Sequence, residues 1–323
     1  MDVSFIVSLV FTFVITVVLA RVFIPVLKSI KMGQKILDIG PRWHKGKEGT
    51  PTMGGLFFIA GAAIPVITFA IYRRDFALVI HYLFVLFNGM IGFVDDYVKF
   101  FKKQNEGLTA IQKLILQFAV TAAYLVALYF SDGLSTTVAL PFTDTSVDLG
   151  VFYYIILLVG IVFTVNSTNL TDGIDGLCSS VTAVSMVFLS VLAIKSGNAE
   201  AGILTGTMLG GALGFLVYNF HPAKVFMGDT GSLYMGACVC AAAMMLDVPI
   251  LLFFVGIIYY VESVSVVIQV ISYKLTKKRV FKMTPIHHHF EMCGWNEVKI
   301  VLVFSAVTAV FAAIGVYGFI GIM

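Results

Sequence analysis

Runs of about 20 consecutive apolar residues recur along the whole chain, separated by short stretches rich in acidic, basic, amide and glycine residues. A helix of about 20 apolar residues spans the roughly 30 Å hydrocarbon core of a bilayer. Backbone polar groups cannot stay unpaired in lipid, so membrane spans are helices or closed barrels. Because the runs are unbroken and lack the alternation of strands, the pattern predicts transmembrane helices.

The pattern predicts an all-α polytopic integral membrane protein with about ten transmembrane helices in a single transmembrane domain, residues 1–323. The predicted spans are 3–25, 54–72, 76–94, 109–130, 151–168, 177–194, 201–219, 230–246, 249–273 and 299–320. The short connection between the seventh and eighth runs leaves nine spans as the alternative. The polar stretch 131–150 predicts a short hairpin.

Composition supports the membrane class of the protein, and the distribution of charge predicts its orientation in the membrane. The chain is 59% hydrophobic and 12% charged, whereas soluble domains carry roughly 25% charged residues. All but three of the 21 lysine and arginine residues fall in alternate loops or at the helix ends beside them; the exceptions are Arg73, Arg74 and Lys195. The positive-inside rule therefore predicts that these loops are cytoplasmic and that both termini lie outside.

Four glycines recur every four residues along the predicted seventh span. They are Gly202, Gly206, Gly210 and Gly214. A ladder of small residues on one helix face lets a neighbouring membrane helix approach closely. The spacing predicts helix packing and no catalytic role.

Unusual polar chemistry gathers in five loops, all on the predicted cytoplasmic side. They read "HKGKEGTPTMGG" (44–55), "GFVDDYVKF" (92–100), "NSTNLTDGIDGL" (166–177), "NFHPAKVFMGDTGS" (219–232) and "KKRVFKMTPIHHHFEMCGW" (277–295). A single carboxylate at a helix end is usually a solvated boundary. Several acidic loops wrapped in glycine, asparagine and threonine at one membrane face instead predict a site.

The acids of these loops suit a hard cation. They are Asp95, Asp96, Asp172, Asp175 and Asp229. Magnesium prefers oxygen ligands and often binds substrate phosphates. The glycines of "TDGIDG" and "MGDTGS" could turn backbone N–H groups toward an anion. The loops together predict magnesium-assisted phosphate chemistry.

The basic residues divide into those that set topology and those assigned to the site. Most lysines follow the positive-inside rule, but Lys47 abuts the polar "GTPT" turn and Lys113 adds positive charge nearby. Adjacent residues diverge by about 100° on a helix. His287, His288 and His289 therefore do not converge easily on one ion, and phosphate binding is favoured over a zinc site.

A transporter or channel is the alternative class, because Glu262 lies inside a predicted span and intramembrane acids often mark ion pathways. The other central span positions carry almost no ionisable groups. No inverted repeat with paired broken helices is visible. The sequence therefore favours an enzyme.

Four motifs in this order resemble the polyprenyl-phosphate N-acetylhexosamine-1-phosphate transferases, integral membrane enzymes that start cell-wall and glycan lipid cycles. They are "GTPTMGG" (49–55), "DD" (95–96), "NLTDGIDGL" (169–177) and "MGDTGS" (227–232). "PIHHHFE" (285–291) is similar to the branch that uses UDP-MurNAc-pentapeptide. Use of UDP-N-acetylglucosamine is the alternative within the family.

The resemblance implies a reaction and its partners. UDP-MurNAc-pentapeptide and undecaprenyl phosphate would give undecaprenyl-pyrophosphoryl-MurNAc-pentapeptide (lipid I) and UMP, with Mg²⁺ required, for peptidoglycan synthesis. The enzyme would lie in the bacterial cytoplasmic membrane with its site on the cytoplasmic face, as a homodimer and without a nucleic-acid partner. Because a phosphate monoester is largely a dianion at pH 7, direct attack is favoured over a covalent aspartyl intermediate.

The resemblance also implies residue roles. Asp229 would hold magnesium, Asp95 would bind or deprotonate the lipid phosphate, and Asp96 would support this region. His288 completes the catalytic candidates. The nucleotide-sugar site would be lined by Lys47, Thr52, Asn169, Asp172 and Asp175, with Phe226 stacking on uracil. The remaining substrate-binding candidates are Lys113, Asn219, Gln269, His287 and His289, of which Asn219 and the histidines would hold the pyrophosphate and sugar.

Overall fold

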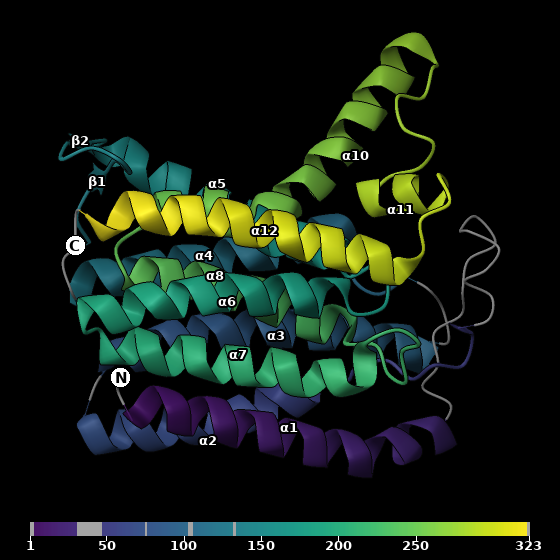
Figure 1. The fold of residues 1–323 in the computed structure, drawn as a ribbon, viewed down its shortest axis with the longest axis horizontal. Coiled ribbons are helices and arrows are strands. Elements are labelled where there is room, and N and C mark those ends of the chain that lie inside the picture. Colours follow the sequence, from purple (N-terminus) through teal and green to yellow (C-terminus); the bar gives the residue numbers. More distant parts are fainter. Residues whose placement is uncertain (1–2, 31–46, 75, 103–105, 132–133, 322–323) are drawn as a thin grey trace.

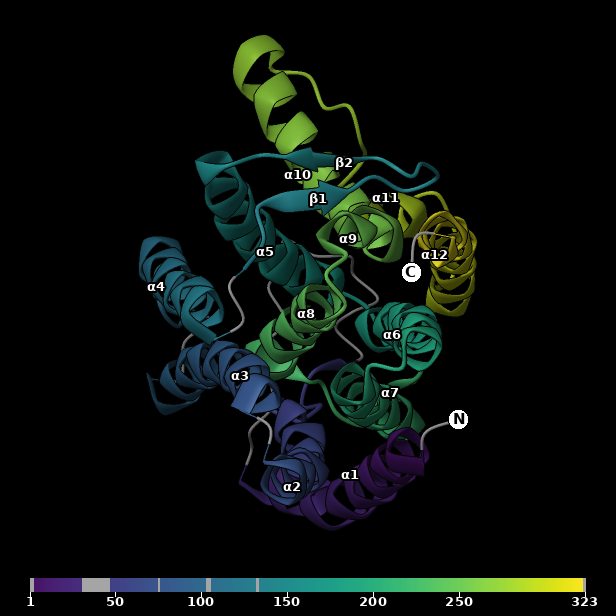
Figure 2. The same ribbon diagram turned by 90° about the vertical axis from the view of Figure 1, so that its left-hand side faces the viewer.

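The computed structural model describes residues 3–30, 47–74, 76–102, 106–131 and 134–321, and these form a bundle of helices with one small hairpin (Figures 1 and 2). Apolar segments in lipid form helices because a helix satisfies all of its backbone hydrogen bonds within the segment itself. The helices are α1 (Val3–Ser29), α2 (Gly55–Arg73), α3 (Phe76–Lys102), α4 (Ala110–Ser131), α5 (Val151–Thr171), α6 (Leu177–Ser196), α7 (Ala199–Asn219), α8 (Gly228–Met245), α9 (Leu252–Val255), α10 (Ile257–Thr276), α11 (Ile286–Glu291) and α12 (Glu297–Ile320).

The predicted class, an all-α polytopic membrane protein, is confirmed. Within the described ranges nine helices are long and apolar enough to cross a membrane, namely α1 to α7, α10 and α12. The predicted eighth span corresponds to α8, whose first turn carries Asp229, Thr230 and Ser232 and is therefore less apolar. Figure 2 shows α8 at the centre of the bundle, surrounded by the other helices.

The predicted ninth span, 249–273, is wrong as one continuous helix. It begins with a 3₁₀ turn at Pro249–Leu251, continues as α9, breaks at Gly256 and resumes as α10. Glycine lacks a side chain and is the weakest helix former after proline. Beyond this break α10 projects away from the bundle (Figure 1).

Several predicted boundaries also fall short. Helix α3 continues from the predicted end at 94 to Lys102, so both acids of the "DD" motif lie within it. Helices α1 and α5 likewise run further, to Ser29 and Thr171. Polar residues do not end these helices because intrahelical hydrogen bonds continue into the interfacial region. Residues 31–46 of the predicted loop 26–53 lie outside the described ranges.

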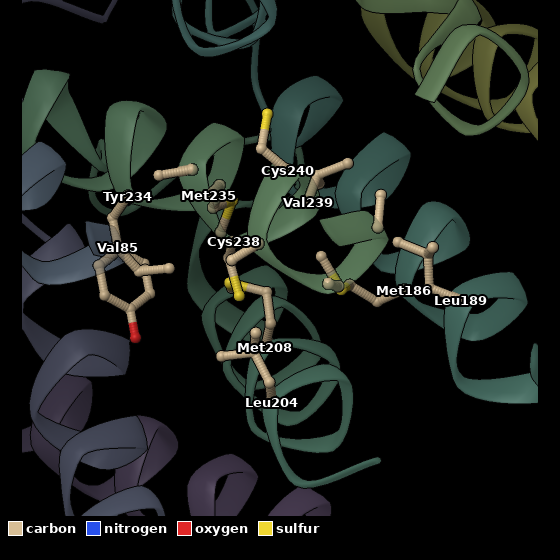
Figure 3. Packing of buried hydrophobic residues seen from close by; sticks show 14 of the residues in the cluster. Val85, Met186, Leu189, Leu204, Met208, Tyr234, Met235, Cys238, Val239 and Cys240 are labelled. Carbon is tan, nitrogen blue, oxygen red and sulfur yellow. The ribbon is translucent and has the colours of Figure 1, made fainter. Parts of the chain in front are cut away.

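The buried centre of the bundle is built from small and sulfur-containing side chains. Helix α8 is almost entirely buried, and the row of alanines near its end allows neighbours to approach closely. At Gly236 a Cβ atom would lie 2.9 Å from Val165 Cα of α5. Figure 3 shows side chains of this core from four helices: Val85 of α3, Met186 and Leu189 of α6, Leu204 and Met208 of α7, and Tyr234, Met235, Cys238, Val239 and Cys240 of α8.

The glycine ladder of α7 serves helix packing, as predicted, and the structure shows that its partner is α1. A Cβ atom at Gly206 would lie 2.8 Å from the Phe5 carbonyl oxygen, and one at Gly214 would lie 2.8 Å from the Phe13 carbonyl oxygen. Real Cβ atoms do not approach this closely, so only glycine permits the contact. Small-residue packing of this kind associates helices in lipid.

The predicted hairpin is present at one end of the bundle. Strands β1 (Thr137–Ala139) and β2 (Ser146–Asp148) pair antiparallel, with Val138 opposite Val147. Figure 1 places the hairpin at the end where α1 begins and α12 finishes, while the connections α7–α8 and α10–α11 lie at the opposite end. The described parts of the motif loops therefore gather together. The assignment of that end to the cytoplasm stays a prediction.

Candidate active site

Helices α3 and α8 cross at very short distance where the site begins. A Cβ atom at Gly92 of α3 would overlap the backbone carbonyl of Asp229. One turn later, Asp96 accepts hydrogen bonds from Asp229 N (3.2 Å), Thr230 N (2.9 Å) and Thr230 Oγ1 (2.7 Å). Free N–H groups at a helix start need acceptors. Asp96 therefore caps α8 from a neighbouring helix and fixes the direction of Asp229.

Three carboxylates meet at this crossing, and we call Asp95, Asp96 and Asp229 the carboxylate cluster. One oxygen from each lies within 4.8 Å of the others. Lys99 Nζ lies 2.5 Å from Asp95 Oδ2 and 3.3 Å from Asp229 Oδ2. Lys113 Nζ lies 3.3 Å from Asp95 Oδ1 and also pairs with Asp229. Two ammonium groups thus face three acids at the end of the bundle.

The second oxygen of Asp229 is held by α5. Asn169 donates from Nδ2 to Asp229 Oδ1 at 3.1 Å and to Ser232 Oγ at 2.7 Å. Asn169 was predicted to line a nucleotide-sugar site, and the structure brings it to the carboxylate cluster. Asp229 therefore has its orientation set from α3, α4 and α5 together.

The donor set fits a hard divalent cation. Carboxylate oxygens are the ligands that magnesium prefers, and a compact group of them needs positive charge to stay ionised. A cavity of about 460 Å³ opens beside the cluster and is lined by Asp95, Lys99, Glu106, Gly107, Leu108, Thr109, Ala110 and Lys113. The cavity offers room for an anion next to two lysines.

A second polar group, which we call the lysine cluster, consists of Lys47, Asp175, His221 and Glu297. Lys47 Nζ donates to Asp175 Oδ1 at 2.7 Å and to Glu297 Oε2 at 2.6 Å. His221 Nδ1 lies 3.0 Å from Asp175 Oδ2. These residues come from four separate segments, so the cluster ties the motif loops to the start of α12.

A cavity of about 380 Å³ lies beside the lysine cluster. It is lined by His221, Glu291, Gly294, Trp295, Asn296 and Glu297. His221 and Glu297 belong to both the cluster and the cavity wall. Asp175, His221 and Glu297 also present ligand atoms within 4.8 Å of one another. The ammonium group of Lys47 supplies the positive charge between Asp175 and Glu297.

The histidine run forms the short helix α11, and each ring has its own partner. His287 Nδ1 lies 3.1 Å from Glu262 Oε2 of α10, and His288 Nδ1 lies 2.6 Å from Glu291 Oε2. His289 Nδ1 instead accepts a hydrogen bond from Lys282 N at 3.1 Å. The three Nδ1 atoms thus have separate protein partners, in keeping with their divergence along a helix.

Asp172 lies between these groups, just after α5. Burial raises the pKa of its carboxyl well above the usual range, and the negative charges of Asp229, Asp96 and Asp175 raise it further. A carboxyl with a strongly raised pKa keeps its proton and can donate a hydrogen bond. Asp172 therefore offers a different chemistry from the paired acids around it.

The "GTPTMGG" motif pairs with the connection between α7 and α8. Phe226 N donates to Pro51 O at 2.8 Å, Gly54 N donates to Phe226 O at 2.9 Å, and Gly55 N donates to Met227 O at 3.1 Å. Phe226 is half-buried beside this pairing. Thr52 lies next to Gly228: a Cβ atom added at Gly228 would be 2.9 Å from Thr52 Oγ1.

Two predicted substrate contacts have both ends of their amides bonded to protein. Asn219 donates to Val225 O at 3.0 Å and accepts from Ser179 Oγ at 3.2 Å. Gln269 donates to Phe281 O at 3.0 Å and accepts from Val280 N and Phe281 N. Their substrate roles stay predictions; the geometry shows them holding the loops that follow α7 and α10.

Sequence reasoning missed several residues of the site. Glu297, His221 and Glu291 were not assigned to it, and Lys99 was left among the lysines that add positive charge nearby and are mostly explained by the positive-inside rule. Glu297 stands in the first turn of α12, where an acid is ordinary because it complements the helix dipole. Its contact with Lys47, 250 positions away, has no local signal. His221 had one, because it lies within the "NFHPAK" loop already singled out.

The comparisons with known proteins show the family of the chain. Residues 76–247 match glycosyl transferase family 4, and the chain belongs to this family of membrane transferases. Residues 47–59, which include Lys47 and the glycine-rich motif, match phospho-N-acetylmuramoyl-pentapeptide-transferase signature 1.

Individual relatives narrow the assignment. The chain is 44% identical to a phospho-N-acetylmuramoyl-pentapeptide-transferase of Clostridium botulinum over 95% of this chain and 94% of the relative. It is 43% identical to that of Caldicellulosiruptor bescii, over 96% of both chains, and 42% identical to that of Halalkalibacterium halodurans, also over 96% of both. The chain is a member of the phospho-N-acetylmuramoyl-pentapeptide-transferase family.

Proposed function

We propose that this protein transfers phospho-MurNAc-pentapeptide from UDP-MurNAc-pentapeptide to undecaprenyl phosphate, giving lipid I and UMP, at the cytoplasmic face of a bacterial cytoplasmic membrane. The observation that carries the proposal is the carboxylate cluster paired with two lysines at one end of a membrane-spanning bundle. Such a position lets a water-soluble nucleotide sugar meet a phosphate on a lipid tail. Family membership supports the same reaction.

The acceptor phosphate is proposed to bind in the cavity beside Lys99 and Lys113. Both ammonium groups lie within 3.3 Å of a carboxylate oxygen of Asp95, so an arriving phosphate dianion would exchange partners with charges already in place. A dianion needs no strong general base. Asp95 would then orient the phosphate through the lysines it contacts.

The transfer is proposed as one displacement at phosphorus. An oxygen of undecaprenyl phosphate attacks the phosphorus that carries the sugar, and a new P–O–P bond forms. The bond from that phosphorus to the bridging oxygen of UMP breaks, and UMP leaves with the electron pair. Positioning and charge stabilisation supply most of the catalysis in such reactions.

Asp229, supported by Asp95 and Asp96, would hold the magnesium ion, which when bound neutralises charge on the diphosphate and on departing UMP. Asn169 donates to the carboxylate of Asp229, and Asp96 accepts from the backbone N–H of Asp229, so both keep it in one orientation. The protein thus fixes the acid before substrates bind, a condition for electrostatic stabilisation in the transition state.

The nucleotide sugar is proposed to lie between the lysine cluster, Phe226 and helix α11. Lys47 and His221 bring hydrogen-bond donors to one side, and Phe226 offers a ring face for uracil. Asp172, whose pKa is raised by burial and by the neighbouring acids, could donate to a substrate oxygen in its protonated form. The homodimer expected from the resemblance is likewise a proposal for the bilayer-embedded enzyme.

The test is a measurement of UMP release by detergent-solubilised protein with magnesium and undecaprenyl phosphate. UDP-MurNAc-pentapeptide should support release at least about a hundredfold faster than UDP-N-acetylglucosamine, a difference of roughly 2.7 kcal/mol in transition-state binding. Omission of undecaprenyl phosphate should abolish release. Preferred use of UDP-N-acetylglucosamine would contradict the substrate assignment, and no UMP from either donor would favour the transporter alternative.

A further inference from the structure

Glu262 is a fully buried carboxylate on α10, within a membrane-spanning segment. Its Oε2 atom lies 3.1 Å from His287 Nδ1 and accepts from His287 N at 3.4 Å. Its Oε1 atom has no hydrogen-bond partner among the described residues. Removing an ionised group from water costs several kcal/mol unless it is well paired. A neutral polar side chain could join α11 to α10 with a smaller desolvation penalty. The presence of a carboxylate therefore indicates a role other than joining the two helices.

The contact determines which nitrogen of His287 faces outward from α10. The carboxylate accepts, so Nδ1 carries a hydrogen and Nε2 is the nitrogen left for another partner. His287 Nε2 is buried and has no hydrogen-bond partner in the described part of the chain. Glu262 and His287, which we call the dyad, therefore leave the Nε2 atom of His287 without a hydrogen-bond partner among the described residues.

The free nitrogen points to the turn between α5 and α6. A Cβ atom at Gly173 would overlap His287 Nε2. Gly173 is exposed and stands between Asp172 and Asp175, both assigned to the nucleotide-sugar site. Its φ angle is not in the left-handed region, so backbone conformation does not require glycine here. The space for the imidazole does.

We propose that Glu262 is a positioning residue that acts through His287. It fixes the hydrogen on Nδ1 and directs Nε2 toward the Asp172–Asp175 turn, where Nε2 contacts the diphosphate–sugar part of the bound donor. The inference rests on the proposed transferase function and deepens it. It also replaces an ion-pathway role for the intramembrane acid with a role in substrate positioning.

The first experiment is a double-mutant cycle on UMP release with Glu262→Gln, His287→Ala and the double variant. Glu262→Gln should lower kcat about tenfold or more and change KM for the nucleotide sugar by less than about threefold, because an aligned contact is lost in the transition state. In the His287→Ala background the same change should cost less than about twofold. Equal losses in both backgrounds would mean a merely structural role and would overturn the proposal.

A second variant, Gly173→Ala, perturbs the His287 ring at Nε2, on the side opposite its contact with Glu262. Gly173→Ala leaves α10 untouched, and its methyl group would displace His287 Nε2. We expect a kcat loss of about tenfold in the wild-type background and little further loss with His287→Ala, which vacates the space. This arm keeps the proposal testable if Glu262→Gln fails to fold. A Gly173→Ala enzyme with wild-type kcat would contradict it.

Two controls calibrate these losses. Ser263→Ala removes a buried hydrogen bond to Ser167 Oγ (2.7 Å) at the next position of α10. Glu200→Gln removes an acid that pairs with Arg73 at 3.2 Å. Both should stay within about threefold of wild-type activity. A loss as large as that of Glu262→Gln in Ser263→Ala would show that any buried polar change in α10 has this effect.

A readout without turnover separates failure of this inference from failure of the proposed function. Selective ¹⁵N-histidine spectra of the detergent-solubilised protein should show His287 with hydrogen on Nδ1, identified by its loss in His287→Ala. Glu262→Gln should shift that population toward Nε2–H. A wild-type His287 with hydrogen only on Nε2 would overturn the dyad even if UMP is released. Spectra as expected without UMP release would instead refute the transferase.

Discussion

The contacts α1–α7 and α3–α8 both depend on glycine, but only one of them carries charge. At α1–α7, Gly206, Gly210 and Gly214 let the two backbones touch, and no ionisable side chain takes part in these contacts. At α3–α8, Gly92 brings the helix onto the carbonyl of Asp229. One turn further along α3 lie the acids of the carboxylate cluster.

The difference teaches what close packing can do at the edge of a membrane. Between the apolar helices α1 and α7, short backbone distances increase van der Waals contact. At the start of α8, the close approach of α3 brings donors within reach of Asp96. Asp96 accepts hydrogen bonds from Thr230 N at 2.9 Å and from Thr230 Oγ1 at 2.7 Å. Packing there sets the position of Asp229 and hence the geometry of the chemistry.

Removal of the charge at Asp229 should give the largest effect. Asp229→Asn keeps the size and one oxygen but loses the charge that a hard cation needs. Magnesium-dependent UMP release should fall about a thousandfold or more, while the variant remains folded. Asp247→Asn, just beyond the other end of α8, is the matched control and should keep normal activity. Near-wild-type release by folded Asp229→Asn would remove Asp229 from the proposed metal site.

Adding one methyl group to each glycine contact should separate the two interfaces. Gly92→Ala should lower kcat about ten- to a hundredfold, because displacing a catalytic group by about 1 Å costs that much. Gly210→Ala, whose methyl would overlap the Leu9 carbonyl, should lower the unfolding temperature but keep the activity of each folded molecule. UMP release per mole of monodisperse protein and thermal unfolding together test this pair. The comparison fails if both variants lose activity to the same extent.

The sequence predicted the fold class and the gathering of the motif loops because the signals are local. Spans follow from runs of apolar residues, and a glycine spacing of four along α7 predicted close helix packing there without identifying α1 as the partner. The motif loops were correctly expected to meet at one end, since alternate connections of a helical bundle share a side. The hairpin was predicted from the polar stretch 131–150 between two apolar runs.

The parts that escaped prediction depend on distant contacts or local breaks. The bend at Gly256 had only a single glycine as its signal, and glycines are frequent in membrane helices. The roles of Asn219 and Gln269 in holding loops depend on the exact course of the backbone. Glu262 was noticed because it lies inside a predicted span, but its partner His287 lies 25 positions away in a different helix. Pairing across such distances is set by tertiary packing, which periodicity does not describe.

Asp172 should give the smallest effect and tests whether the turn between α5 and α6 behaves as an enclosed site. Its pKa is raised in the folded state, chiefly by burial and then by Asp229, Asp96 and Asp175. The folded protein therefore holds this proton more tightly than the unfolded chain, whose aspartate titrates near 3.9. Stability contributed by the neutral carboxyl is full below about pH 4 and declines as the pH rises toward the folded-state pKa.

Asp172→Asn keeps the side chain neutral at every pH and should escape this decline. With chelator present, so that no metal alters the charge balance, the unfolding temperatures of the two proteins should differ least near pH 4. By pH 8 the unfolding temperature of the variant should exceed that of the wild type by about 2–4 °C. For a protein of this size, a change of about 1 kcal/mol in the free energy of unfolding shifts the unfolding temperature by about 2–4 °C or less. Asp148→Asn is the matched control, because Asp148 lies exposed in the hairpin at the other end and its pKa is lowered by hydrogen bonds from Thr136 and Gly150. That variant should show no gain as the pH rises. A constant difference across the pH range, or a loss of stability in Asp172→Asn at pH 8, would mean that the carboxyl is ionised in the folded protein and that the turn is open to water like the hairpin.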